Sequence, residues 1–176
     1  MAKLQSFVQS DWINTDEWQL VENIANEFYE FLNLTETINQ ILLTNKPSAK
    51  SSEIQELLLK KAINLGFINE SKGLFSEYKN NRLRPDYYLK LPNNTGILME
   101  VERGKTNQNN MDFLDFWKCH ICNYAHYLFL IVPQELRQNT SGKISGKPYD
   151  TVINHLEPLF IPANYTNVRG VYIFGY

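Results

Sequence analysis

Cysteine is scarce in this chain, and its two cysteines stand close together. Cys119 and Cys122 are too few for a framework of disulfide bonds, so we expect a protein of the reducing cytoplasm. The run Cys119-His120-Ile121-Cys122 invites a zinc site. On a helix, however, both cysteines fall on other faces than His120, and structural zinc needs four converging ligands. A core histidine beside two free thiols is the better interpretation.

Long hydrophobic runs and glycine-rich phosphate loops are also missing. The longest apolar run, residues 128–132, is far too short to cross a bilayer, and the first twelve residues lack the apolar region of a secretory signal. We therefore expect no membrane partner. Neither GxxxxGK[ST] nor GxGxxG occurs, so the sequence indicates no nucleotide cofactor.

What the chain does contain is an ordinary globular composition with an uneven charge. With 43% apolar and 20% charged residues, its 176 residues suit one domain. The net charge of −2 does not by itself suggest a nucleic-acid partner. Residues 1–58, however, carry nine acids and three bases, whereas residues 59–176 carry fourteen bases and ten acids. A local basic rim on such a protein can engage phosphates.

Hydrophobic periodicity predicts helices and strands in alternation. The expected helices are 16–33, a shorter one from Thr35, 52–65, 111–124 and 151–160, and the expected strands are 67–78 (broken near 71–73), 86–91, 97–102, 126–132 and 168–176. Residues 134–149 read as a polar loop that either closes over a substrate or has no such role.

One of these helices, 111–124, is expected to turn its aromatic side inward. Its predicted buried face consists of Phe113, Phe116, Trp117, His120, Ile121 and Tyr124. Its predicted opposite side carries Met111, Asp115 and Lys118.

The most informative stretch is a hairpin that carries three acids. Asp86 follows Pro85 at the start of its first strand, and Glu100 and Glu102 close its second. Because side chains alternate along a strand, Glu100 and Glu102 point to the same face. Carboxylates held so close repel unless a proton or cation lies between them, and oxygen ligands suit Mg²⁺. A solvated rim of charge is the alternative interpretation for any one of these acids.

Pro85-Asp86 and Glu100-Val101-Glu102 together resemble the metal-binding motif of the PD-(D/E)XK superfamily, the restriction-endonuclease-like nucleases. In that family a lysine stands two residues after the second acid, where this chain has Glu102. Glu102 is then either a base or a further metal ligand, and Lys105 and Lys118 are candidates for a relocated lysine.

The resemblance implies an α/β fold with a restriction-endonuclease-like core, a central mixed β-sheet flanked by helices, and extra N-terminal helices. It divides the single domain 1–176 into accessory helices (1–50), a nuclease-like core (51–133), and a loop, helix and terminal strand (134–176). It implies hydrolysis of DNA with Mg²⁺ or Mn²⁺, in a protein that often acts as a homodimer.

The same resemblance assigns roles to particular residues. Its implied catalytic residues are Asp86, Glu100, Glu102 and Lys105; its implied metal ligands are Asp86, Glu100, the Val101 carbonyl and Glu53; its implied phosphate contacts are Arg84, Arg103 and Lys105. For Glu53, a first-turn acid favoured by the helix dipole is the alternative. Two other functions stay open: a DNA-binding protein that has lost catalysis, and a protein-interaction module on the same fold.

Overall fold

The chain folds into a six-stranded mixed sheet between two layers of helices. The computed structural model describes residues 1–44, 51–69, 73–78, 83–102, 110–138 and 140–176. Its elements are β1 (Lys3–Val8), η1 (Ser10–Trp12), α1 (Asp16–Leu32), α2 (Thr35–Thr44), α3 (Ser51–Asn64), β2 (Ile68–Asn69), β3 (Tyr87–Leu91), β4 (Thr95–Val101), α4 (Met111–Ile121), β5 (Tyr127–Val132), β6 (Leu136–Arg137), β7 (Ile144–Gly146), α5 (Pro148–Leu156), η3 (Glu157–Phe160), η4 (Pro162–Asn164) and β8 (Gly170–Gly175).

The strand order of the sheet is β1-β8-β5-β4-β3-β2. β5 pairs in parallel with both β4 and β8, whereas β1, β3 and β2 join by antiparallel pairing. All six residues of β5 are buried, because a parallel strand inside such a sheet is covered on both faces. This mixed sheet flanked by helices confirms the predicted α/β architecture.

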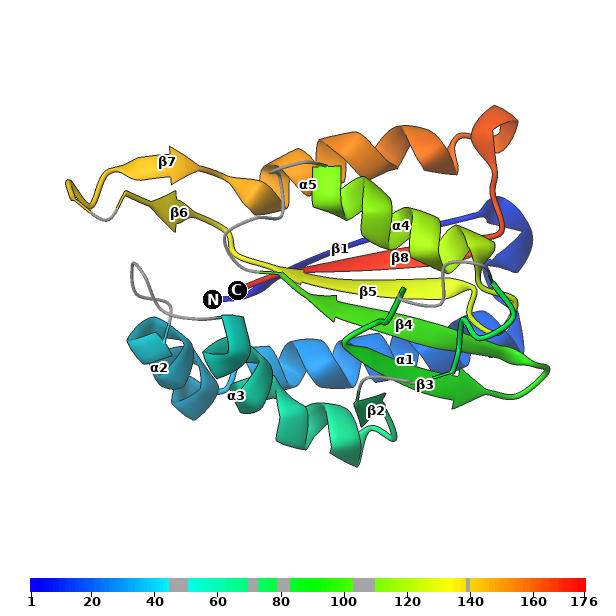
Figure 1. Ribbon diagram of the computed structural model, residues 1–176, viewed down its shortest axis with the longest axis horizontal. Coiled ribbons are helices and arrows are strands. Elements are labelled where there is room, and N and C mark those ends of the chain that lie inside the picture. The colour runs from blue at the N-terminus through cyan, green and yellow to red at the C-terminus, as the bar shows by residue number, and fades with distance from the viewer. Residues whose placement is uncertain (45–50, 70–72, 79–82, 103–109, 139) are drawn as a thin grey trace.

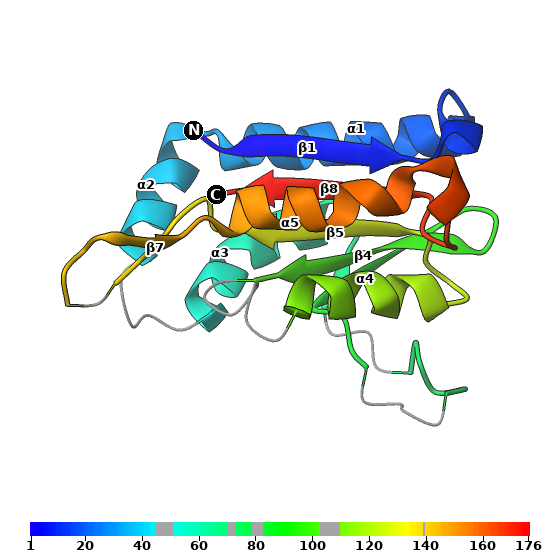
Figure 2. The ribbon, with the colours of Figure 1, turned by 90° about the horizontal axis from the view of Figure 1, so that it is seen from above.

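Helices cover both faces of the sheet. α1, α2 and α3 lie on one face and α4 and α5 on the other (Figure 1). Seen from above, α5 lies over β5 and β8, and α4 runs beside β4 (Figure 2). Within the described part of the chain, no helix combines the length and the apolar character that a membrane span requires.

α1 shows how local sequence sets an element. Its N-cap residue Thr15 accepts a hydrogen bond from the backbone nitrogen of Trp18 at 3.1 Å, and two acids follow in the first turn, where the helix dipole favours them. The predicted stripe is buried against the sheet, and its members are Val21, Ala25, Phe28 and Leu32. The expected helix 16–33 is thereby confirmed.

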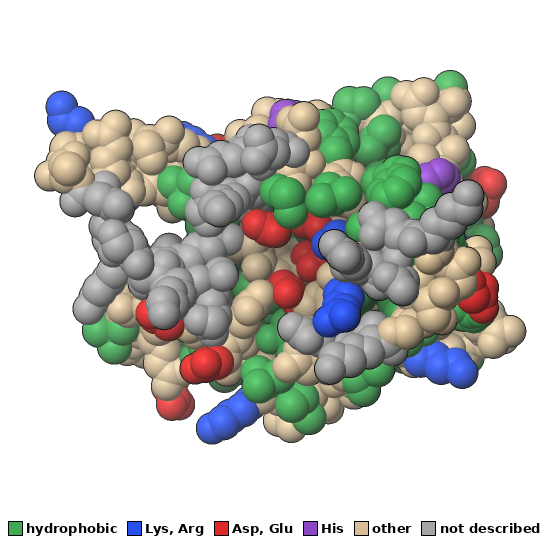
Figure 3. Space-filling view, viewed as in Figure 1, with side chains coloured by type: hydrophobic (Ala, Val, Ile, Leu, Met, Phe, Trp, Pro, Cys, Tyr) green, Lys and Arg blue, Asp and Glu red, His purple; other side chains and the backbone are tan. Residues whose placement is uncertain are grey.

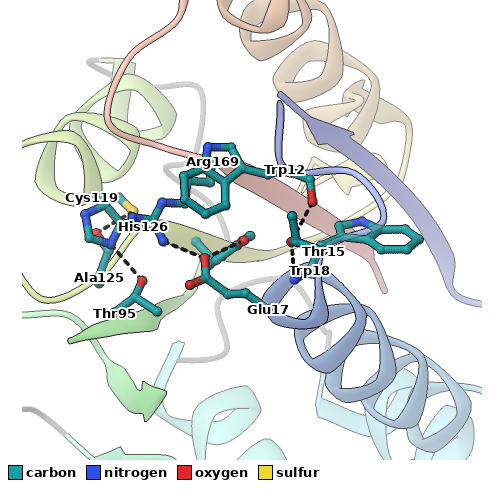
Figure 4. Close-up of polar contacts among 10 residues, drawn as sticks. Trp12, Thr15, Glu17, Trp18, Thr95, Cys119, Ala125, His126 and Arg169 are labelled. Carbon is teal, nitrogen blue, oxygen red and sulfur yellow. Dashed lines mark hydrogen bonds and ion pairs between the residues drawn. The ribbon is translucent and has the colours of Figure 1, made fainter. Parts of the chain in front are cut away.

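A polar cluster fastens the start of α1 to one end of the sheet (Figure 4). Glu17 Oε1 accepts hydrogen bonds from the Tyr127 hydroxyl at 2.9 Å and from Arg169 Nη1 at 2.5 Å. The Arg169 guanidinium lies 3.7 Å from the centre of the Trp12 ring, close enough for a cation–π contact. This cluster adjoins Thr95, at the start of β4. The hairpin acids lie at the other end of the β3–β4 hairpin.

Residues 1–50, expected as accessory helices, also contain a strand. Lys3–Val8 forms the edge strand β1, paired antiparallel with β8 from Lys3↔Gly175 to Val8↔Gly170. Its partner lies more than 160 residues away in the chain, so no local pattern announces the pairing. α1 packs directly on this sheet and is part of the core rather than an accessory layer.

Two other expectations need correction. Residues 134–149 are not one loop, because β6 and β7 pair as an antiparallel hairpin and α5 begins at Pro148. Proline at the first turn of a helix leaves no hydrogen bond unmade. Among the described residues of the expected strand 67–78, only the two of β2 pair with β3, and residues 73–77 form turns.

Candidate functional site

The hairpin brings Asp86 and Glu100 together. β3 and β4 pair with Tyr87 opposite Met99, which places Asp86 beside the end of β4. Asp86 Oδ2 accepts a hydrogen bond from the backbone nitrogen of Val101 at 2.8 Å, and the backbone nitrogen of Asp86 donates to Glu100 Oε2 at 3.2 Å. The two carboxylates are thus held by each other's strands.

Glycine at position 96 allows this hairpin to pack. A Cβ there would lie 2.6 Å from the Leu89 carbonyl oxygen and 2.8 Å from that of Tyr124. Before it, Asn93 and Asn94 turn the chain with φ angles of 62° and 54°, which asparagine tolerates better than most residues. The predicted hairpin is confirmed, but its turn is shorter than expected, at residues 92–94, because Thr95 and Gly96 already belong to β4.

Glu102 lies one residue beyond β4, and its backbone is held from two sides. Its N–H donates to the Ile131 carbonyl at 2.8 Å, and its carbonyl accepts from the Tyr176 hydroxyl at 2.9 Å. Burial raises the pKa of the Glu102 carboxyl to about 7, with help from the charges of Asp115 and Asp86. A carboxylate with this pKa can gain or lose a proton near neutral pH.

The inward face of α4 is the largest correction to the sequence prediction. Asp112, Asp115 and Lys118 are buried, whereas Phe113 is 39% exposed and Trp117 is 46% exposed. Only Phe116 of the predicted aromatic face is buried. The helix is rotated so that charged side chains at positions i, i+3 and i+6 face the sheet.

Lys118 joins α4 to the hairpin acids. Its Nζ lies 2.8 Å from Glu100 Oε1 and 2.8 Å from Asp115 Oδ1. Burial alone would lower the pKa of Lys118, but the charges of Glu100 and Asp115 outweigh it and raise that pKa. The ammonium therefore stays charged between two carboxylates.

The two carboxylates around Lys118 lie deep in the protein. Glu100 is 4% exposed and Asp115 is fully buried. Burial raises the pKa of Glu100 well above its usual range, and the Asp115 charge adds to this, with only partial relief from Lys118. Burial also raises the pKa of Asp115 to about 6. Both shifts arise mainly from burial, which disfavours the charged form of a carboxyl group.

A second buried aspartate extends the row. Asp112 Oδ2 lies 2.6 Å from Nδ1 of His155 on α5, and the His155 ring stacks on Phe113 with 5.0 Å between ring centres. Within the described residues, Asp112 Oδ1 and Asp115 Oδ2 accept no hydrogen bond, and Asp115 Oδ1 contacts the Lys118 ammonium. In the space-filling view, acidic side chains gather in a hollow at the centre of the face, beside basic ones (Figure 3).

Comparison with known proteins bears on the fold. No protein-family profile matches this chain, and no curated protein matches its sequence. The crystal structure of the restriction endonuclease BglII complexed with a DNA 16-mer aligns over 99% of this chain and 77% of that chain, with a TM-score of 0.50 and 13% sequence identity. The fold is of the restriction-endonuclease type.

Within this restriction-endonuclease-type fold, the other predicted site residues fall in different places. The Val101 side chain is buried on the opposite face of the sheet, and Arg84 is exposed just before the hairpin. Glu53 is exposed in the first turn of α3. Arg103 and Lys105 lie outside the described residues.

The donor chemistry of Asp86, Glu100 and Asp115 fits a hard divalent cation, but these side chains do not form a cage. Asp86 and Glu100 supply carboxylate oxygens, and Asp115 Oδ2 is a nearby buried oxygen that accepts no hydrogen bond within the described residues. Among the described residues, however, no three His, Cys, Asp or Glu side chains are grouped as metal ligands. Lys118 already stands between two of the carboxylates.

Sequence reasoning missed Asp112 and Asp115 and placed Lys118 on the outward side of its helix. One signal was available, because three charged residues at spacing i, i+3 and i+6 share one face of a helix. Because charged residues normally lie on the solvated side of a helix, the prediction placed the apolar residues on the buried face and the charged ones on the exposed face.

Proposed function

We propose that this chain is a nuclease that hydrolyses phosphodiester bonds in DNA with the help of Mg²⁺ or Mn²⁺, as a PD-(D/E)XK variant with glutamate at the usual lysine position. The observation that carries the proposal is the meeting of Asp86, Glu100 and Lys118 at the end of β4. The fold supports it, since BglII shares this architecture.

Each residue has a role in this proposal. Asp86, Glu100 and the Val101 carbonyl would hold the cation, with Glu53 as a further candidate ligand. When bound, the cation would lower the pKa of a water molecule and offset negative charge on the scissile phosphate. Glu102 would orient the attacking water or accept its proton, a task suited to its pKa of about 7.

Lys118 and Lys105 are the two candidates for the relocated lysine of the motif. Lys118 is the stronger one, because its ammonium contacts Glu100 directly. Lys105, which lies outside the described residues, would also act in catalysis and contact a DNA phosphate. Arg84, with Arg103, would contact DNA phosphates, which positions the substrate without reading its sequence.

Plasmid nicking tests the function. We expect Mg²⁺-dependent nicking that falls by about a hundredfold or more in Asp86→Ala, while gel-shift binding of DNA persists. Lys60→Met serves as a control, because Lys60 is exposed on α3 across the sheet. Binding without nicking in the wild type would instead support a DNA-binding protein that has lost catalysis. Absence of both activities would support a protein-interaction module.

A homodimer also belongs to this proposal, and the outward face of α4 is its proposed contact. Phe113, Leu114 and Trp117 are exposed together there, and an uncharged aromatic surface suits a two-fold symmetric contact. Light scattering should give the mass of a dimer for the wild type and of a monomer for Trp117→Glu. A wild type that stays monomeric at all concentrations would exclude the pairing.

A further inference from the structure

Every carboxylate oxygen of Glu100 is already engaged. Oε1 contacts the Lys118 ammonium at 2.8 Å, and Oε2 accepts the backbone N–H of Asp86 at 3.2 Å. Asp86 Oδ2 in turn accepts a hydrogen bond from the backbone N–H of Val101 at 2.8 Å. A cation that binds to Glu100 must therefore displace one of these donors or share an oxygen with it.

Lys118 is the donor that can leave most readily. The backbone N–H of Asp86 directly precedes the paired strand β3, and that of Val101 lies in β4, which pairs with β5, so neither can move far without disturbing the sheet. The Lys118 ammonium, by contrast, sits on a flexible four-carbon stem with rotatable donors. It also has a second carboxylate, Asp115, one helical turn away on its own helix.

We propose that the Lys118 ammonium is a tethered cation that competes with the divalent ion for Glu100 and withdraws to Asp115 when the ion binds. On this inference, which rests on the proposed function, ion binding requires the ammonium to leave Glu100 and remain with Asp115. Lys118 then acts as a positioning residue: without the ion it neutralises two buried carboxylates, and with the ion it is retained by one.

The Lys118 contact therefore sets the affinity for the ion. Lys118→Met removes the competing ammonium, and we expect Mn²⁺ to bind about tenfold tighter or more, because a like charge close to the ion has been removed. Asp115→Asn leaves the ammonium with Glu100 alone, and we expect Mn²⁺ to bind several times more weakly.

A double-mutant cycle separates this competition from a direct effect of Asp115. If Asp115 acts by retaining Lys118, then Asp115→Asn has almost no effect on Mn²⁺ affinity in the Lys118→Met background. If Asp115 is itself a ligand or acts through its field, its substitution weakens binding equally in both backgrounds, and that result overturns the inference.

The measurement is Mn²⁺ titration by calorimetry on the full, metal-stripped chain, with Lys60→Met as the matched control. An affinity of Lys118→Met that equals or falls below that of the wild type contradicts the proposal. Should Lys118→Met fail to fold, Asp115→Asn still decides, because unchanged or tighter Mn²⁺ binding by that variant also contradicts it. Nicking is assayed separately. If the wild type nicks DNA but Lys118→Met binds Mn²⁺ no more tightly than the wild type, this inference fails and the nuclease proposal stands. A wild type that binds Mn²⁺ but cleaves nothing defeats only the nuclease proposal.

Discussion

The hydroxyl of Tyr176 donates a hydrogen bond to the backbone carbonyl of Glu102, with 2.9 Å between the two oxygens. Tyr176 directly follows β8, and Glu102 directly follows β4, with β5 between these strands. Together with the Glu102 N–H that donates to Ile131 on β5, this contact fixes the peptide of Glu102 beyond the end of its own strand. The backbone from which the Glu102 side chain extends is therefore fixed in position.

Tyr176→Phe tests whether this contact positions Glu102. We expect kcat for DNA nicking in Mg²⁺ to fall about fivefold with little change in KM, because one hydrogen bond contributes about 1 kcal/mol. Tyr165→Phe is the control, since the Tyr165 hydroxyl contacts Ser10 instead. An unchanged kcat would show that Glu102 does not depend on this bond.

The stability of the metal-free protein should fall as pH rises through neutrality. Burial raises the folded-state pKa of Glu102 to about 7 and that of Asp115 to about 6, against ordinary values of 4.5 and 3.8. The folded protein therefore binds these protons more tightly than the unfolded chain does. Their stabilising contribution is complete below the ordinary values of 4.5 and 3.8 and is lost as pH rises through the folded-state values.

Glu102→Gln removes one of these titrations. After allowance for its partial exposure, we expect the fall in unfolding free energy between about pH 5 and about pH 8 to be smaller by about 1–2 kcal/mol than in the wild type. Urea denaturation in the presence of a chelator measures this. The same pH dependence of the unfolding free energy in wild type and variant would contradict a raised pKa of Glu102.

Two neighbouring aromatics on α4 test its orientation. Phe116 is buried, and Phe116→Ala should lower the unfolding free energy by about 3–5 kcal/mol. Trp117 is largely exposed, and Trp117→Ala should lower it by less than about 1 kcal/mol. Both are measured by urea denaturation at low protein concentration. If Trp117→Ala lowers the unfolding free energy strongly and Phe116→Ala lowers it little, the helix instead has the orientation expected from the apolar pattern.

The pair of Asp112 and His155 should matter for stability. His155→Ala leaves a buried carboxylate without its 2.6 Å partner, and we expect a loss of about 2 kcal/mol in thermal or urea unfolding. Asp112→Asn in the same background should recover part of that loss, because the uncompensated charge is then gone. If Asp112→Asn instead lowers the stability of His155→Ala further, the loss is not due to an uncompensated Asp112 charge.

The sequence by itself determined the elements whose causes are local. The acid-bearing hairpin follows from the turn formers at residues 92–96, and α1 from its threonine cap and apolar stripe. The meeting of Asp86 and Glu100 follows as well, because strand alternation and a short turn leave little choice of register.

The tertiary structure alone decided which charges are buried. Whether Asp115 and Lys118 face solvent or the sheet depends on Glu100, a residue on another element, because a buried charge is stable only beside its counter-charge. The pairing of β1 with β8 is equally non-local, since an edge strand is defined by a partner near the other end of the chain.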